Sequence, residues 1–142
     1  MTSDLIPWYV CESQHIRKIE RDPAKITSLI KTAHTRLKYL KGQKVAVENV
    51  SFIIEGYYEV MKELLSALLL SQGMRSSNHQ CLISFFAKNY PAHEAEAHFI
   101  SRLSFLRNRL NYYGENIDFT FYLQHTEDID KVIKLLTSLL IK

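Results

Sequence analysis

The chain has 142 residues, about the size of one domain, and 46% of them are hydrophobic, enough to build a core. Its 4 glycines and 3 prolines fall below average usage of about 7% and 5%, which favours long helices over a turn-rich β fold. The 18 Lys and Arg exceed the 15 Asp and Glu by only three charges. This excess is too small to indicate a nucleic-acid-binding protein by charge alone.

The cysteines and the apolar runs predict a cytoplasmic protein with no membrane segment. Cys11 and Cys81 are far apart and show no CxxC or CxxH spacing, so we expect two reduced thiols rather than a disulfide framework or a zinc site. Met1–Asp4 shows no basic region followed by an apolar run, so no signal peptide is predicted. The most apolar run, Leu64–Leu70, is far shorter than the about 20 residues that cross a bilayer.

Two long helices are predicted in the first half of the chain. Residues 1–22 are weakly patterned and predict an N-terminal arm or short helix. Asp22–Pro23 combines an N-cap acid with a proline at the first helical position, and the helix that follows should end near Gly42. The next helix should run from Lys44 to Gln72, and Gly56 within it indicates close helix packing.

Three more helices are predicted in the second half. A short helix should span His79 to Asn89, and a longer one His93 to Tyr113. Ile117–Leu123 alternates briefly but has no second strand to pair with, so we expect a connector. Thr126–Asp128 should begin the final helix. The prediction is a single all-α domain over residues 1–142, an up-and-down bundle of about five helices.

The end of the helix over 93–113 carries an unusual set of polar side chains. A helical wheel predicts a core stripe at Phe99, Leu103, Leu106 and Leu110. Arg107 and Asn111 then share one flank, and Arg102 and Arg109 share the other. Asn108 should face directly away from the core, and Tyr112 should point outward beside Gly114, which ends the helix. Arginines here can stabilise the helix dipole, but the amides and the tyrosine are not needed for that.

This stretch resembles the signature of HEPN domains. In that family an arginine, usually followed by Asn, Asp or His, precedes a histidine by four to six residues near a helix end, and Phe105–Gly114 reads FLRNRLNYYG. Ser77–Phe86 resembles the segment before the signature, where a small residue is followed by His and an apolar run. Glu55–Glu59 lies on a long helix like the second helix of the family. The resemblance spans roughly Ile26 to Leu140.

The resemblance implies a helical bundle that dimerises through the signature helices. Many members are metal-independent ribonucleases, often toxins paired with a minimal nucleotidyltransferase or another antitoxin; others are non-catalytic and bind RNA, nucleotides or proteins. By position, Arg107 would hold the scissile phosphate, with Asn108 supporting it. The expected histidine falls on Tyr112, or on Tyr113 or Gly114 for longer spacings, and no histidine is present there.

The missing histidine favours binding over cleavage. Histidine, with a pKa of about 6.5, suits proton transfer near neutral pH, whereas tyrosine, at about 10, is a poor base. Arginines can bind phosphate bidentately, and an exposed tyrosine can stack on a base. We therefore expect a homodimer that binds RNA or a nucleotide, non-catalytic or weakly active, with no metal or cofactor. The candidate catalytic residues are Arg107, Asn108 and Tyr112, and the candidate nucleic-acid-binding residues are Arg102, Arg107, Arg109, Asn111 and Tyr113.

Two alternatives remain open. The first is an active endoribonuclease toxin of a toxin–antitoxin pair. The second is a protein-interaction module with no nucleic-acid role, motivated by the wide apolar stripe from Val50 to Leu70 and by the final helix. Glu55 and Glu59 lie one turn apart, but the Glu-x-x-His pattern of a di-iron bundle is missing from that helix, so a solvated flank is the better interpretation.

Overall fold

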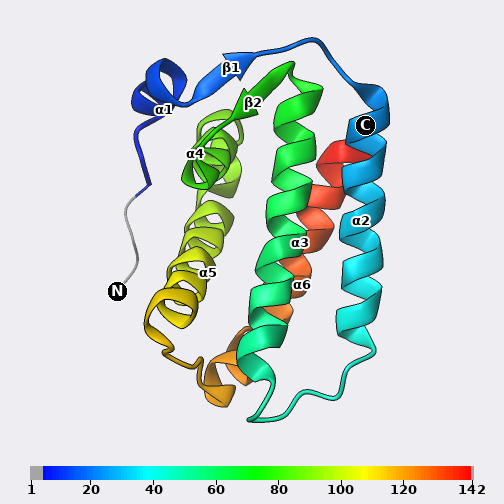
Figure 1. The fold of residues 1–142 in the computed structure, drawn as a ribbon, viewed down its shortest axis with the longest axis vertical. Helices are drawn as coiled ribbons and strands as arrows, with labels where there is room; N and C mark the ends of the chain where they lie inside the picture. The colour runs from blue at the N-terminus through cyan, green and yellow to red at the C-terminus, as the bar shows by residue number, and fades with distance from the viewer. Residues whose placement is uncertain (1–4, 142) are drawn as a thin grey trace.

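The computed structural model describes residues 5–141, so residues 1–4 of the predicted arm, and the signal-peptide interpretation that depends on them, lie outside the described residues. Within 5–141 the chain forms six α-helices, a 3-10 turn and one pair of strands. In chain order these are α1 (Trp8–Gln14), β1 (Ile16–Lys18), α2 (Pro23–Lys41), α3 (Val50–Ser71), β2 (Met74–Ser76), α4 (His79–Asn89), η1 (Pro91–His93), α5 (Glu94–Tyr113) and α6 (Phe119–Ile141). The predicted mostly helical bundle is confirmed (Figure 1).

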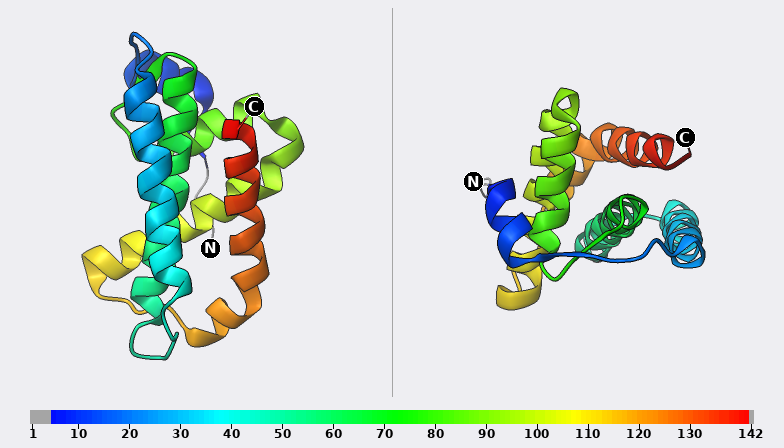
Figure 2. Two further views of the ribbon diagram at one scale, coloured as in Figure 1. Left: turned by 90° about the vertical axis from the view of Figure 1, so that its right-hand side faces the viewer. Right: turned by 90° about the horizontal axis from the view of Figure 1, so that it is seen from above.

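Helix α3 lies at the centre of the bundle, because it is apolar on nearly every side. Helix α2 packs on one side of it, α6 lies behind it, and α4 and α5 cover the remaining side (Figures 1 and 2). The apolar stripe from Val50 to Leu70 is buried in the chain's own core. Among the described residues, no helix combines the length and the apolar character needed to cross a membrane.

Local capping signals place several helix ends where the sequence predicts them. The Asp22 side chain accepts a hydrogen bond from the Lys25 amide at 3.0 Å, which fixes the start of α2. Asn78 does the same for the Gln80 amide at 2.8 Å, at the start of α4. Helix α5 ends at Gly114, whose φ of 66° lies in the left-handed region that glycine adopts without strain.

Gly56 lies where Leu40 of α2 packs closely on α3. A Cβ at this position would lie 2.6 Å from Cδ2 of Leu40, so the predicted close helix packing is confirmed. A bidentate ion pair joins the same two helices, with Arg36 Nε and Nη2 donating to Glu63 at 3.1 and 3.0 Å. Close packing at Gly56 and the Arg36–Glu63 ion pair therefore both stabilise the contact between α2 and α3.

Helix α3 starts later than the sequence predicts. The expected start at Lys44 is wrong because the Asn49 side chain closes a loop before the helix. Its amide donates to the Lys44 carbonyl at 3.0 Å, and its oxygen accepts from the Ala46 amide at 2.8 Å. The helix begins only at Val50.

Helix α6 starts earlier than the sequence predicts. The sequence predicts a connector over residues 117–123 and a helix start near Thr126, and both predictions are wrong because α6 begins at Phe119. Phe119, Phe121 and Tyr122 pack against the core from its first turn. Aromatic packing outweighs the low helix propensity of these residues and the helix-start signal at Thr126.

The short N-terminal helix is confirmed, but the strand pair beside it was not predicted. Strands β1 and β2 are antiparallel, with Ile16 opposite Ser76 and Lys18 opposite Met74. Three-residue strands are too short to show the alternation that identifies a strand in sequence. The hydrogen-bonded pairing of β1 with β2 joins the N-terminal segment to the connection between α3 and α4 (Figure 1).

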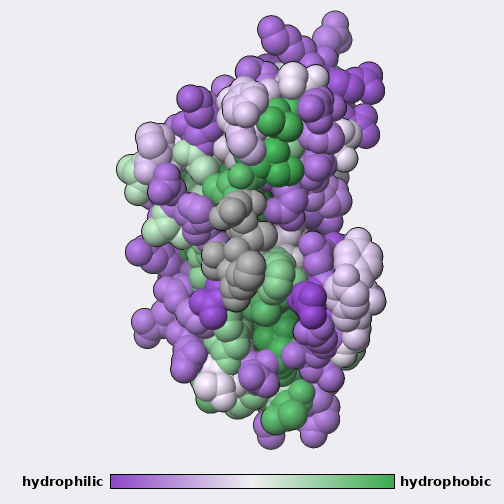
Figure 3. Space-filling view, turned by 90° about the vertical axis from the view of Figure 1, so that its left-hand side faces the viewer, coloured by the Kyte–Doolittle hydropathy of each residue, from purple (hydrophilic) through white to green (hydrophobic). Residues whose placement is uncertain are grey.

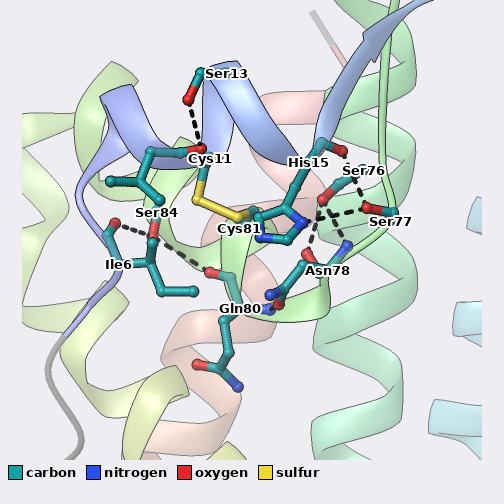
Figure 4. Close-up of a disulfide and its surroundings, with 11 residues drawn as sticks. Ile6, Cys11, Ser13, His15, Ser76, Ser77, Asn78, Gln80, Cys81 and Ser84 are labelled. Carbon is teal, nitrogen blue, oxygen red and sulfur yellow. Dashed lines mark hydrogen bonds between the residues drawn. A yellow bond between two sulfur atoms is a disulfide. The ribbon is translucent and has the colours of Figure 1, made fainter.

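A disulfide joins Cys11 on α1 to Cys81 on α4, so the prediction of two reduced thiols is wrong (Figure 4). The two Cα atoms are 5.6 Å apart, within the range that a disulfide spans, and both cysteines are fully buried. Ser84, one turn along α4, donates a hydrogen bond to the Ile6 carbonyl at 2.6 Å. Sequence spacing could not reveal this pairing, because only the folded chain brings residues 70 positions apart together.

Candidate nucleic-acid-binding site

The buried face of α5 differs from the predicted stripe. Its fully buried residues include two serines and one alanine: Ala97, Ile100, Ser101, Leu103 and Ser104. The larger side chains Phe99, Leu106 and Leu110 are only half-buried. Small side chains let α5 pack closely on its neighbours. Arg107 lies one helical turn after the buried Ser104, so its side chain points toward α3 rather than out on a flank.

Arg107 is held between α3 and its own neighbour on α5. Its Nη2 lies 3.7 Å from a carboxylate oxygen of Glu59, and its Nη1 donates to the Asn108 side-chain oxygen at 3.3 Å. Its Nε is buried and has no hydrogen-bond partner in the structure, while 26% of the side chain is exposed. Asn108 is half-buried beside it, so the prediction that Asn108 faces directly away from the core is wrong.

Glu59 is shared between two cations. Lys62, one turn along α3, contacts it at 2.8 Å, while the Glu59–Arg107 distance of 3.7 Å is longer than a hydrogen bond. One carboxylate therefore faces two positive charges, and the pairing leaves about one unit of positive charge. The same contacts make Glu59 part of an ion-pair network rather than the purely solvated flank that the sequence favoured.

Buried hydroxyl groups brace this part of α5. Gln80 on α4 donates to the Ser104 Oγ at 2.6 Å, and Tyr58 on α3 forms a hydrogen bond with the same serine. Burial raises the pKa of Tyr58, while the Ser104 hydrogen bond and the charge of Arg107 oppose that rise. Ser104 thus links three helices next to Arg107.

His79, the first residue of α4, lies within the electrostatic reach of the same charges. Partial desolvation lowers its pKa, and the positive charges of Lys62 and Arg107 lower it further, against the opposing effect of Glu59. The imidazole is therefore neutral at pH 7. Reasoning from the signature missed this histidine, because it precedes Arg107 by a whole helix. The only signal in the sequence was the Ser77–Phe86 segment.

We refer to Glu59, Lys62, His79, Arg107 and Asn108 as the Arg107 cluster. Three helices contribute to it, and its sum is net positive with the histidine neutral. Such an arrangement can bind a phosphate through a guanidinium and an ammonium group, and it offers an imidazole that can accept a proton.

The other predicted site residues lie apart from the Arg107 cluster. Arg109 pairs with Glu115 and lies over the ring of Tyr113, with its Cζ 4.6 Å from the ring centroid. Arg102 is exposed and lies over the ring of Phe121 on α6, at 4.9 Å. The structure therefore divides the predicted residues among separate surfaces of α5.

The last turn of α5 projects from the bundle, as Figure 2 shows. Asn111 is exposed there, and so are Tyr112 and Tyr113, at 74% and 68%, so the predicted outward direction of Tyr112 is confirmed. On the α1–α4–α5 side of the molecule, apolar side chains also reach the surface between hydrophilic ones (Figure 3). Exposed aromatic residues on a projecting turn are typical of surfaces that contact a partner or a base.

No known protein family, curated protein or solved structure matches the chain. The resemblance to HEPN domains therefore stays a prediction from the sequence.

Proposed function

We propose that the chain is a HEPN-like RNA-binding protein in which the Arg107 cluster contacts a backbone phosphate. In this proposal the protein acts as a homodimer and is non-catalytic or weakly active. One observation carries the proposal: Arg107 is positioned by its neighbours but not saturated by them.

The guanidinium keeps hydrogen-bonding capacity for a ligand. Its carboxylate partner stands 3.7 Å from Nη2, beyond hydrogen-bond distance, so Nη2 remains able to donate to a ligand. Arginine presents its donors in a planar fork that matches a phosphate, and a charge-assisted hydrogen bond is about twice as strong as a neutral one. A phosphate between Arg107 and Lys62 would replace the long contact to Glu59 with short ones.

The homodimer is proposed from the projecting end of α5. Tyr112 and Tyr113 expose most of their surface there, and aromatic residues are enriched in protein interfaces. The resemblance to HEPN domains implies pairing through this helix. In a dimer, two copies of the Arg107 cluster would flank one RNA chain.

The test is binding of a labelled single-stranded RNA, followed by fluorescence anisotropy at low salt. Replacing Arg107 with Gln should weaken binding about 10- to 100-fold, the value of one hydrogen bond to a charged group. The salt dependence should also fall, by about 0.7 in the slope of log K against log salt for each lost phosphate contact. Lys134→Gln is the matched control, because it removes one charge from an exposed position on α6.

A second variant is expected to raise the affinity for RNA instead of lowering it. Glu59→Gln removes a negative charge beside Arg107 and Lys62 and should strengthen RNA binding. If Arg107→Gln and Lys134→Gln weaken binding equally, or if Glu59→Gln weakens it, the Arg107 cluster is not the phosphate site.

The neutral imidazole of His79 favours a second candidate function, metal-independent RNA cleavage. In that reaction His79 would accept the 2′-hydroxyl proton, the 2′-oxygen would bond to phosphorus, and the bond to the 5′-oxygen would break. Arg107 would stabilise the phosphate charge, and the leaving 5′-oxygen would take a proton from the imidazolium. Products ending in a 2′,3′-cyclic phosphate should form in the presence of EDTA and disappear in His79→Gln. Intact RNA with the wild-type protein would exclude this function.

The remaining expectations concern protein partners. A small nucleotidyltransferase or another antitoxin protein is the partner that the resemblance implies, and co-purification of a co-expressed pair would test it. The interaction module without a nucleic-acid role loses its main motivation, because the stripe from Val50 to Leu70 is buried inside the chain's own core.

A further inference from the structure

A cavity of about 180 Å³ lies where the start of α2, the end of α3, β2 and the start of α4 meet. Two cationic side chains line it, Lys25 and Arg75, together with the neutral imidazole of His79, and none of the described lining residues is a carboxylate. Its floor is aliphatic and includes Leu69, Leu70 and Leu82, which are at most 5% exposed. The cavity therefore combines a cationic rim with an apolar floor.

The cationic side chains at this cavity lie outside the ion pairs that the described residues form. None of the ion pairs within residues 5–141 involves Arg17, Lys25 or Arg75. The β1–β2 register places Arg17 directly opposite Arg75. Like charges in that position destabilise a strand pair, so a bound anion would relieve a repulsion built into the fold.

The N-terminus of α4 adds to the positive electrostatic potential at the cavity. His79 is the first residue of α4, an 11-residue helix whose cap is the neutral Asn78. Lys25 lies in the first turn of α2, but there Asp22 caps the helix with a carboxylate. The positive end of the α4 dipole thus points at the cavity without a compensating acid at its cap.

We propose that this cavity binds a small organic phosphate, with the phosphate on Arg75, Lys25 and His79 and one apolar ring on the leucine floor. The size fits this ligand class, since an engineered apolar cavity of about 150 Å³ in another protein holds benzene. The site shares His79 with the Arg107 cluster, but its cations are Lys25 and Arg75 rather than Arg107 and Lys62. Its occupation does not require that Arg107 bind RNA.

The experiment is an NMR titration of the ¹⁵N-labelled full chain with phenyl phosphate. Saturable shifts should appear at the backbone amides of residues 74–79, and the affinity should be about tenfold higher than for inorganic phosphate because the ring adds apolar contact. Benzyl alcohol, which carries the ring without the charge, should bind more weakly than phenyl phosphate.

Two exposed variants locate the contact. Arg75→Gln and Lys25→Gln should each weaken phenyl phosphate binding by about tenfold or more, while Lys134→Gln should leave it unchanged. Shifts that do not saturate, or binding that survives Arg75→Gln, would overturn the site. Equal affinity for phosphate and phenyl phosphate would overturn the apolar half of the proposal. Loss of RNA binding in Arg107→Gln alone bears only on the other site.

Discussion

Reduction of the disulfide between Cys11 and Cys81 should lower the stability of the protein strongly. The bond closes a loop between residues 70 positions apart. In the chain-entropy description, a loop of this length removes about 15 cal/mol/K from the unfolded chain, or about 4 kcal/mol of free energy of unfolding at room temperature. That is a large fraction of the about 5–15 kcal/mol that stabilises an ordinary domain.

Urea denaturation followed by circular dichroism measures this effect. With a slope of about 2 kcal/mol/M, the midpoint should fall by about 2 M when reductant is added to the wild-type protein. The double variant Cys11→Ala/Cys81→Ala should show the low midpoint with and without reductant. This control separates the covalent link from any general effect of the reductant.

A midpoint that falls by less than about 0.5 M in the wild type would refute the reasoning. It would mean that the packing of α1 on α4 and the β1–β2 pair already hold the N-terminal segment in place. Hydrogen exchange of the α1 and β1 amides, compared in the oxidised and reduced protein, would show whether reduction destabilises the N-terminal segment.

Three further predictions concern packing and charge. Gly56→Ala should lower the free energy of unfolding by about 1–3 kcal/mol in urea denaturation, because the added Cβ would lie 2.6 Å from Cδ2 of Leu40. An unchanged midpoint would show that the Leu40 side chain moves aside freely. Ser51→Ala leaves the buried Ile117 amide without its acceptor at 2.8 Å and should cost about 1–3 kcal/mol in the same assay, unless another acceptor replaces it. The pKa of His79 is lowered in the folded protein, so the unfolded chain binds more protons and stability should fall as pH drops through about 6.5. An NMR titration of its imidazole should give a midpoint below that of a free histidine, and a higher one in Arg107→Gln; a midpoint that does not respond to Arg107 would contradict the cluster.

Local signals predicted much of the fold. Caps act within one turn of the chain, so Asp22 and Asn78 start α2 and α4 where the sequence indicates, and Gly114 ends α5. The features that the sequence did not reveal depend on contacts between distant segments. Examples are the Cys11–Cys81 bond and the start of α6, where aromatic packing on the core extends the helix.

The candidate site also depends on contacts between distant segments, which the sequence alone did not reveal. The sequence predicted a polar cluster at Arg107, but a helical wheel built on large apolar residues predicted a different buried face for α5. Ser101 and Ser104 occupy the buried face because small side chains permit close helix contact. Glu59 and His79 belong to other helices, and only the packing of α3, α4 and α5 brings the Glu59 carboxylate and the His79 imidazole within electrostatic reach of Arg107.

The attachment of the N-terminal segment also has a consequence for biosynthesis. Strand β1 and Cys11 find their partners only at β2 and α4, 70 residues later for the cysteine. At about 5–20 residues per second, the ribosome needs about 4–14 s to make that stretch. The segment with α1 and β1 therefore cannot reach its final place until β2 and α4 have been made. During that interval the Cys11 thiol has no partner on this segment, and a chaperone or the thiol of another molecule has access to it.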